Sequence, residues 1–118
     1  MNKSIKILIA DDTSNNRLLI KTMLKTFGYK NVTEVENGMG AIDKVQSNDY
    51  DLIFMDIQMP KIDGIVATQY IRNTLKRTMM IVGITAYDYI KAEENGFDLI
   101  IRKPYPMEEI KQVIEKFI

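Results

Sequence analysis

Polar side chains that could do chemistry together follow the short apolar runs of this sequence. They are the acidic pair Asp11 and Asp12, then Asp56, Thr85 and Lys103. Carboxylates that share a pocket repel one another and raise at least one pKa, unless a cation relieves the repulsion. A hard divalent ion such as Mg²⁺ takes oxygen ligands and leaves room in its shell for phosphate oxygens. In such a site Asp56 could attack phosphorus as a carboxylate nucleophile, while Lys103 and Thr85 contact the phosphoryl oxygens.

The element that would position Asp56 is the apolar run 52–56, which reads Leu-Ile-Phe-Met-Asp. A continuous apolar run of this length predicts a strand that is buried on both faces of a parallel sheet. Pro60 and Gly64 then predict a turn. Asp56 is therefore expected at the carboxyl end of a central strand, where open α/β sheets bind their ligands.

Each polar residue also has a purely structural explanation. Asp11 or Asp12 could cap a helix, Thr85 and Asp56 could simply end strands, and Lys103 could be a surface charge before a turn. These explanations are acceptable one at a time. They do not account for three carboxylates, a hydroxyl and an amine at the ends of successive strands.

The spacing of apolar residues predicts the other elements. Further strands are expected over residues 6–10, 31–35, 80–84 and 99–101. A first helix should follow an N-cap at Thr13, Ser14 or Asn15 and stop at Gly28. The helices carry apolar residues at helical spacing, and these are Ile20, Met23, Leu24 and Phe27; Ala41, Ile42 and Val45 after the turn Asn37-Gly38; Ala67, Ile71 and Leu75 after Gly64; and Ile110, Val113, Ile114 and Phe117.

Strands that alternate with helices predict an α/β fold, with a doubly wound parallel sheet covered by helices on both faces. The carboxyl ends of all its strands lie on the same edge, so the polar residues should meet there. Residues 87–95 are polar and only weakly periodic, and Gly96 should terminate this segment.

Composition narrows the function classes. A length of 118 residues predicts one domain over 1–118, and a net charge of zero gives no broad basic surface for nucleic acid or anionic membrane. The absence of His and Cys leaves only oxygen ligands for a metal and fits a reducing, cytoplasmic location. No apolar run approaches the length of a membrane span.

Taken together, these residues resemble the response regulator receiver domain, in its chemotaxis-regulator-like form, over the whole chain. The matching features are the acidic pair, Met-Asp-Ile-Gln-Met-Pro around Asp56 with Asp63-Gly64 after it, Thr85-Ala86, and Lys103-Pro104. The resemblance implies a flavodoxin-like fold with strand order 2-1-3-4-5. It also implies a cis peptide between Lys103 and Pro104.

For function, the resemblance implies that Asp56 is the phosphoacceptor for a histidine kinase or a histidine phosphotransfer domain in a two-component system. It implies that Mg²⁺, or Mn²⁺, is held by Asp12, Asp56 and the backbone carbonyl of Gln58, with Asp11 acting largely through water. Phosphate-binding residues would be Thr85, Ala86 and Lys103, and the positions that tune phosphate lifetime would be Gln58 and Tyr87. The chain would catalyse only its own phosphorylation and dephosphorylation.

The sequence departs from the family pattern at the switch, which would consist of Thr85 and the residue three positions before the lysine. That position is usually aromatic and here is Ile100, which lacks a ring and a polar tip. The stretch between Thr85 and Lys103 is also about one helical turn shorter than usual in the family, so the fourth helix should be short or partly irregular. These departures keep open a pseudo-receiver that acts as a constitutive protein-interaction module. An Mg²⁺-dependent phosphatase is disfavoured because no general base is evident, and flavin binding because the first loop is acidic and lacks glycine.

Overall fold

The computed structural model describes residues 3–88 and 90–117, without the side chain of Phe117. The described residues form, in chain order, β1 (Ile7–Ala10), α1 (Ser14–Thr26), β2 (Val32–Val35), α2 (Gly38–Ser47), β3 (Leu52–Asp56), α3 (Gly64–Asn73), β4 (Met80–Thr85), α4 (Ala92–Asn95), β5 (Leu99–Arg102) and α5 (Met107–Phe117). The strands form one sheet of order β2-β1-β3-β4-β5, and each neighbouring pair is parallel. The predicted strand order is confirmed.

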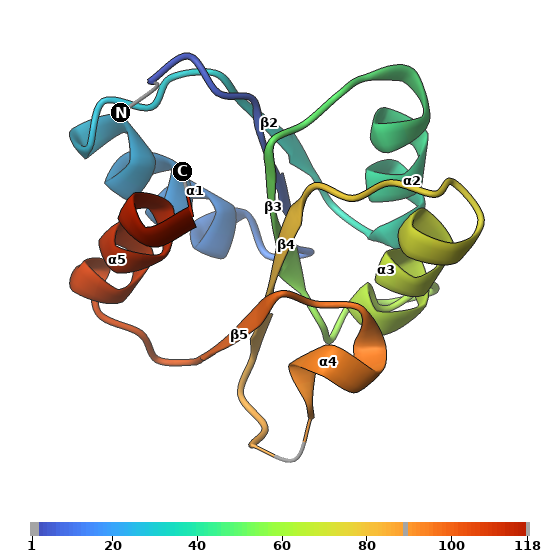
Figure 1. The fold of residues 1–118 in the computed structure, drawn as a ribbon. Coiled ribbons are helices and arrows are strands. Elements are labelled where there is room, and N and C mark those ends of the chain that lie inside the picture. Colours follow the sequence, from blue (N-terminus) through green and yellow to red (C-terminus); the bar gives the residue numbers. More distant parts are fainter. Residues whose placement is uncertain (1–2, 89, 118) are drawn as a thin grey trace.

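Helices cover both faces of the sheet, with α1 and α5 on one side and α2, α3 and α4 on the other (Figure 1). The side chains of alternate residues in each strand pack on opposite faces of the sheet. In β3, Leu52 and Phe54 belong to the core beneath α1 and α5, whereas Ile53 and Met55 belong to the core beneath α2 and α3. Every residue of β3 is buried. The prediction of a strand buried on both faces is therefore confirmed. Its residues are continuously apolar because both faces of the strand pack against helices.

Two details differ from the sequence predictions, and a third prediction falls outside the described residues. Thr13 is the N-cap of α1, but its side chain makes no cap hydrogen bond. Instead its backbone N–H donates to Asp11 Oδ1 at 2.9 Å, so the acidic residue orders the start of the helix. The helix α3 ends at Asn73, before Leu75, which packs partly buried against the core under α2 and α3. The side chain of Phe117, the last member of the predicted stripe in α5, lies outside the described residues.

The fourth helix is short, as predicted. It spans Ala92–Asn95, contains no buried residue, and ends at Gly96 with a left-handed φ of 87°. Glycine adopts this conformation without steric cost, which allows the chain to turn directly into β5.

We expect the amides of residues 87–95, residue 89 aside, to exchange with solvent faster than those of α5. The helix α4 has no buried side chain, whereas Ile110, Val113 and Ile114 anchor α5 in the core. Local opening should therefore be easier by at least about 1.4 kcal/mol, or roughly tenfold in exchange rate. Native-state hydrogen exchange measures this difference, and equal protection of the two helices would contradict it.

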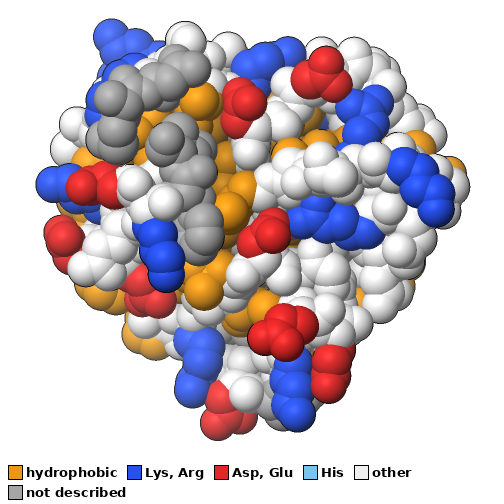
Figure 2. Space-filling model, in the orientation of Figure 1, with side chains coloured by type: hydrophobic (Ala, Val, Ile, Leu, Met, Phe, Trp, Pro, Cys, Tyr) orange, Lys and Arg blue, Asp and Glu red, His pale blue; other side chains and the backbone are white. Residues whose placement is uncertain are grey.

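Charged side chains of both signs are interspersed over the face shown in Figure 2, which carries no broad field of one sign. This distribution agrees with the net charge of zero. Among the described residues, every helix falls short of the length and apolar character needed to cross a membrane.

Candidate functional site

The acidic residues predicted to meet do meet, at the carboxyl edge of the sheet. Asp11 and Asp12 follow β1, and Asp56 ends the neighbouring strand β3, so parallel pairing of Ala10 with Met55 brings the two strand ends together. Carboxylate oxygens of the three residues all lie within 4.8 Å of one another. Asp11 and Asp56 are buried and Asp12 is exposed. The cluster is therefore shielded from solvent at Asp11 and Asp56 and open to solvent at Asp12.

The electrostatics of this cluster disfavour the ionised form of Asp56. Its pKa is raised from the ordinary value of 3.8 to about 6, first by burial and then by the charge of Asp11, while Lys103 acts in the opposite direction. Lys103 Nζ lies 3.4 Å from Asp56 Oδ1. One ammonium does not compensate for the burial and the neighbouring carboxylates. A cation that binds the carboxylates would relieve this repulsion.

Thr85 lies at the end of β4 and is fully buried. Its hydroxyl donates to Gln58 Oε1 at 3.0 Å and accepts from the backbone N–H of Tyr87 at 3.1 Å. The loop after β3 and the loop after β4 are therefore joined through one hydroxyl group. In this arrangement the proton of the Thr85 hydroxyl points to Gln58, so a phosphoryl oxygen would compete with Gln58 for it.

The backbone places Lys103 opposite Asp56. The N–H of Lys103 donates to the carbonyl of Thr85 at 2.8 Å, one residue beyond the last paired residue of β5. The Lys103–Pro104 peptide bond is cis, as the resemblance implied.

A close backbone approach holds the loop between Asp56 and α3. The N–H of Gly64 donates to the carbonyl of Ile57 at 2.9 Å, and Asp63 Oδ1 caps α3 by accepting from the N–H of Val66 at 2.9 Å. A Cβ at position 64 would overlap the carbonyl oxygen of Asp56 and lie 2.9 Å from the Cα of Ile57. Only glycine fits here without moving the backbone that carries Asp56.

Replacing Gly64 with Ala should destabilise the fold by about 1–3 kcal/mol, because the new methyl group meets rigid backbone. Urea unfolding measures the loss, and the amide chemical shifts of Asp56 and Ile57 should move. The matched control is Val66→Ala in the same turn of α3, where the side chain is 50% exposed. A Gly64→Ala variant as stable as the control would contradict this account of the loop.

The donor set suits a hard divalent cation. Three carboxylate oxygens converge from one side, and a cleft of about 510 Å³ adjoins them, lined in part by Asp12 and Gln58. Oxygen ligands on one side and open space on the other match the coordination habits of Mg²⁺, which keeps waters and phosphate oxygens in its shell.

Comparisons with known proteins agree with this geometry. The family model described as the response regulator receiver domain matches residues 7–115. The chain belongs to this family. The osmosensing histidine protein kinase SLN1 of Saccharomyces cerevisiae is 35% identical over 97% of the chain, which spans only 10% of that relative. The chemotaxis protein CheY-3 of Vibrio cholerae is 32% identical, over 98% of the chain and 93% of that protein.

A solved structure shows the same fold. The response regulator protein TrrA of Thermotoga maritima, in complex with Mg²⁺ and BeF, has a TM-score of 0.87 and 33% identity, and the match covers 97% of this chain and 99% of the other. As a receiver domain, the chain has a phosphoacceptor role in two-component signalling.

Other predicted residues of this receiver domain lie at the rim of the cluster or beyond it. Tyr87 is 48% exposed after β4, next to Ala86. Ile100 lies in β5 beside Gly83 of β4 and is partly buried against the core under α2 and α3. Their roles stay predictions.

Sequence reasoning missed two residues near the receiver-domain cluster. Burial and the charges of Asp11 and Asp56 raise the pKa of Tyr105 to about 12, which places this phenol in the field of the carboxylates. Arg17 of α1 donates from Nη1 to the backbone carbonyl of Asp11 at 2.7 Å. The only signal for either residue was its nearness in sequence to the lysine or to the acidic pair.

Proposed function

We propose that this domain accepts a phosphoryl group on Asp56 and thereby changes its binding to a partner. The observation that supports this proposal is the convergence of Asp11, Asp12 and Asp56 within 4.8 Å, with Lys103 at 3.4 Å from Asp56. A buried carboxylate beside a cation site and an ammonium group is equipped for one reaction above others, which is nucleophilic attack on phosphorus.

In the proposed reaction, a carboxylate oxygen of Asp56 attacks the phosphorus of a phosphohistidine. The new bond is an acyl phosphate O–P bond, and the P–N bond breaks as the imidazole leaves with its electron pair. Lys103 stays next to the phosphoryl group and offsets its charge. The Thr85 hydroxyl turns from Gln58 Oε1 to a phosphoryl oxygen. Ala86 follows Thr85 in the sequence, and its backbone is proposed to contact the same phosphoryl group.

Asp12, Asp56 and the backbone carbonyl of Gln58 are the proposed ligands of Mg²⁺ or Mn²⁺, and Asp11 the proposed ligand of a bound water. When bound, the ion supplies positive charge that offsets the developing charge of the phosphoryl oxygens. The chain's own residues hold the donor oxygens in place and keep Asp56 away from bulk solvent.

Mg²⁺ binding without phosphate should be weak and should depend on Asp12. An Asp12→Ala variant removes the exposed carboxylate of the cluster, and a calorimetric or NMR titration should show affinity lowered by roughly tenfold or more. The matched control is Asp43→Ala on α2, whose side chain is exposed outside the cluster. Unchanged affinity of Asp12→Ala would place the metal elsewhere.

The direct test of the proposed function is the intact mass of the protein after incubation with a small phosphodonor. Addition of one phosphoryl group with Mg²⁺, and none with a chelator, is the expected result. The absence of labelling in both conditions would support the pseudo-receiver alternative, in which the domain binds partners without switching.

The proposed donor is a histidine kinase or a histidine phosphotransfer domain, because receiver domains of this family occur in histidine kinases such as the yeast relative. The net charge of zero gives no broad basic surface for nucleic acid or anionic membrane, so the proposed output partner is a protein or a further protein domain. Residues 1–118 are proposed to be one domain that acts only on its own phosphoryl group. The cytoplasmic location stays a prediction from the sequence.

Thr85 and Ile100 are the proposed switch residues. Ile100 is partly buried and has no polar group to exchange between two positions. A phosphoryl group shifts a conformational equilibrium only through contacts that differ between the two states. We therefore propose that the loops after β3 and β4 respond to phosphorylation more strongly than β5 and α5 do.

A further inference from the structure

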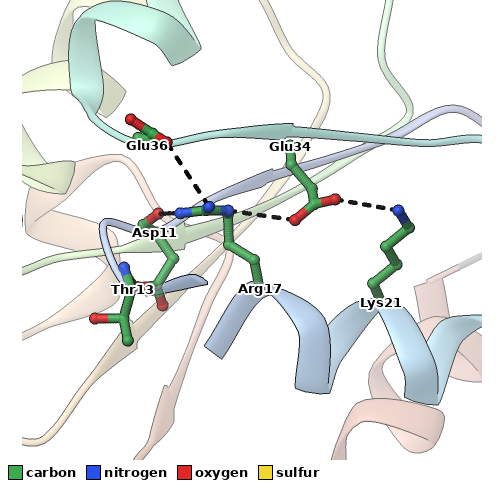
Figure 3. Close-up of polar contacts among 6 residues, drawn as sticks. All are labelled: Asp11, Thr13, Arg17, Lys21, Glu34 and Glu36. Carbon is green, nitrogen blue, oxygen red and sulfur yellow. Dashed lines mark hydrogen bonds and ion pairs between the residues drawn. The ribbon is translucent and has the colours of Figure 1, made fainter. Parts of the chain in front are cut away.

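The loop that carries the acidic pair is held by its backbone. Residues 11–13 connect β1 to α1 and include no glycine. The N–H of Asp11 donates to the carbonyl of Val35 at 3.1 Å, and its Oδ1 accepts from the N–H of Thr13 at 2.9 Å. Its carbonyl oxygen accepts from Arg17 Nη1 at 2.7 Å (Figure 3). All three bonds restrict Asp11, and only in the last is the donor a side chain.

Arg17 is itself fixed from the other side. Its Nε lies 3.2 Å from Glu34 Oε1, and its Nη2 lies 3.9 Å from Glu36 Oε1. Glu34 belongs to β2 and is paired with Ile9 of β1, so its position is set by the sheet. The side chain of Arg17 is only 12% exposed. The guanidinium group therefore spans from the edge strand to the acidic loop, as Figure 3 shows.

The carbonyl that Arg17 holds belongs to the peptide between Asp11 and Asp12. A peptide group is planar, so fixing its oxygen also fixes the rotation of the N–H and the direction in which the chain enters Asp12. Asp12 is exposed, and no hydrogen bond of its side chain is observed among the described residues. The backbone therefore sets the Cα–Cβ direction of Asp12, and with it the region that its carboxylate can reach.

We propose that Arg17 is a positioning residue of the metal and phosphoryl site, which holds the carbonyl of Asp11 and thereby sets the backbone direction from which the Asp12 carboxylate reaches the site. The inference rests on the proposed function. A planar guanidinium with several N–H donors can hold a carbonyl and a carboxylate at the same time, whereas an ammonium is a compact charge on a flexible stem.

The charge and the geometry of Arg17 should have opposite effects on the affinity for a cation. A positive group near the carboxylates should weaken Mg²⁺ binding, although Glu34 and Glu36 offset that charge. Removing the guanidinium should therefore strengthen binding if charge dominates and weaken it if positioning dominates. The sign of the change separates the two effects.

The test compares Arg17→Met and Arg17→Lys with Lys21→Met in titrations with Mg²⁺ alone. Lys21 is a matched control because its Nζ lies 3.2 Å from the same Glu34, one turn further along α1. Both Arg17 variants should bind Mg²⁺ about tenfold more weakly than the wild type, and Lys21→Met should bind within about twofold. Arg17→Lys keeps the charge, so a loss of Mg²⁺ affinity in this variant would be due to geometry.

Thermal unfolding without Mg²⁺ and the amide spectrum outside residues 11–13 show whether each variant is folded. Arg17→Lys keeps the charge and most of the length of the side chain, so it provides the comparison if Arg17→Met does not fold. Wild-type affinity or tighter binding in the folded Arg17 variants would overturn the inference. Failure of the wild type itself to bind Mg²⁺ would instead overturn the proposed function.

Discussion

The Asp56→Asn variant is expected to gain no phosphoryl mass when the domain is incubated with a small phosphodonor and Mg²⁺. An amide oxygen is a far weaker nucleophile than a carboxylate, and the substitution also removes one charge from the cation site. Asp56 is the carboxylate within reach of Lys103, at 3.4 Å, and it ends the central strand. The effect should therefore be loss of labelling rather than a change in rate.

The matched control is Asp43→Asn, which makes the same chemical change at an exposed position of α2. It should gain one phosphoryl group, as the wild type does. Intact-mass spectrometry separates the labelled and unlabelled forms directly. Labelling of Asp56→Asn to the level of this control would show that another residue accepts the phosphoryl group, and the assignment of Asp56 would fall.

The same variant should be more stable than the wild type at pH 7 when no metal is bound. The pKa of Asp56 in the folded protein is raised from 3.8 to about 6, mainly by burial. The folded state therefore binds the proton more tightly than the unfolded state does. Stability from this group is present at low pH, and it is lost as the pH rises from about 4 to about 6. Above that range the folded state carries the full penalty of the buried charge.

The size of the effect follows from the two pKa values. The difference between 3.8 and about 6 corresponds to at most about 3 kcal/mol in the free energy of unfolding. We expect Asp56→Asn to exceed the wild type by about 1–3 kcal/mol at pH 7 and to match it near pH 4. Urea unfolding with a chelator at both pH values measures the gap.

Mg²⁺ provides an internal check on this second prediction. The ion binds the folded wild type and should raise its stability by mass action, while the variant should gain less. The gap at pH 7 should then narrow as Mg²⁺ is added. A gap of the same size at pH 4 and pH 7, or a less stable variant at pH 7, would refute the electrostatic account of Asp56.

Much of the architecture could be predicted from local sequence patterns. The run Leu52–Asp56 is buried on both faces, and Lys103 reaches Asp56 although 47 residues separate them in the chain. A parallel α/β sheet gathers the carboxyl ends of its strands on one edge, so residues at strand ends meet without any further specification. This is why a strand pattern and a few polar residues were enough to predict the acidic cluster, whereas the order of the strands was implied by the family resemblance.

Element boundaries were less well predicted. The helix α3 ends at Asn73, although the apolar spacing continues to Leu75. Leu75 still packs against the core, because a residue just past a helix can fill the same space. Local spacing therefore indicates which side chains are buried, but tertiary packing decides where the helix stops.

The sequence by itself determined the fold, the strand ends and the residue types that meet at the carboxyl edge. Only the tertiary structure decided which polar groups pair there. The Thr85 hydroxyl bonds to Gln58, 27 positions away, and Arg17 bridges the acidic loop to Glu34 of the edge strand. The raised pKa of Asp56 likewise comes first from burial. Hydrogen-bond partners and desolvation depend on distances between side chains from different elements, and periodicity along the chain carries no information about those distances.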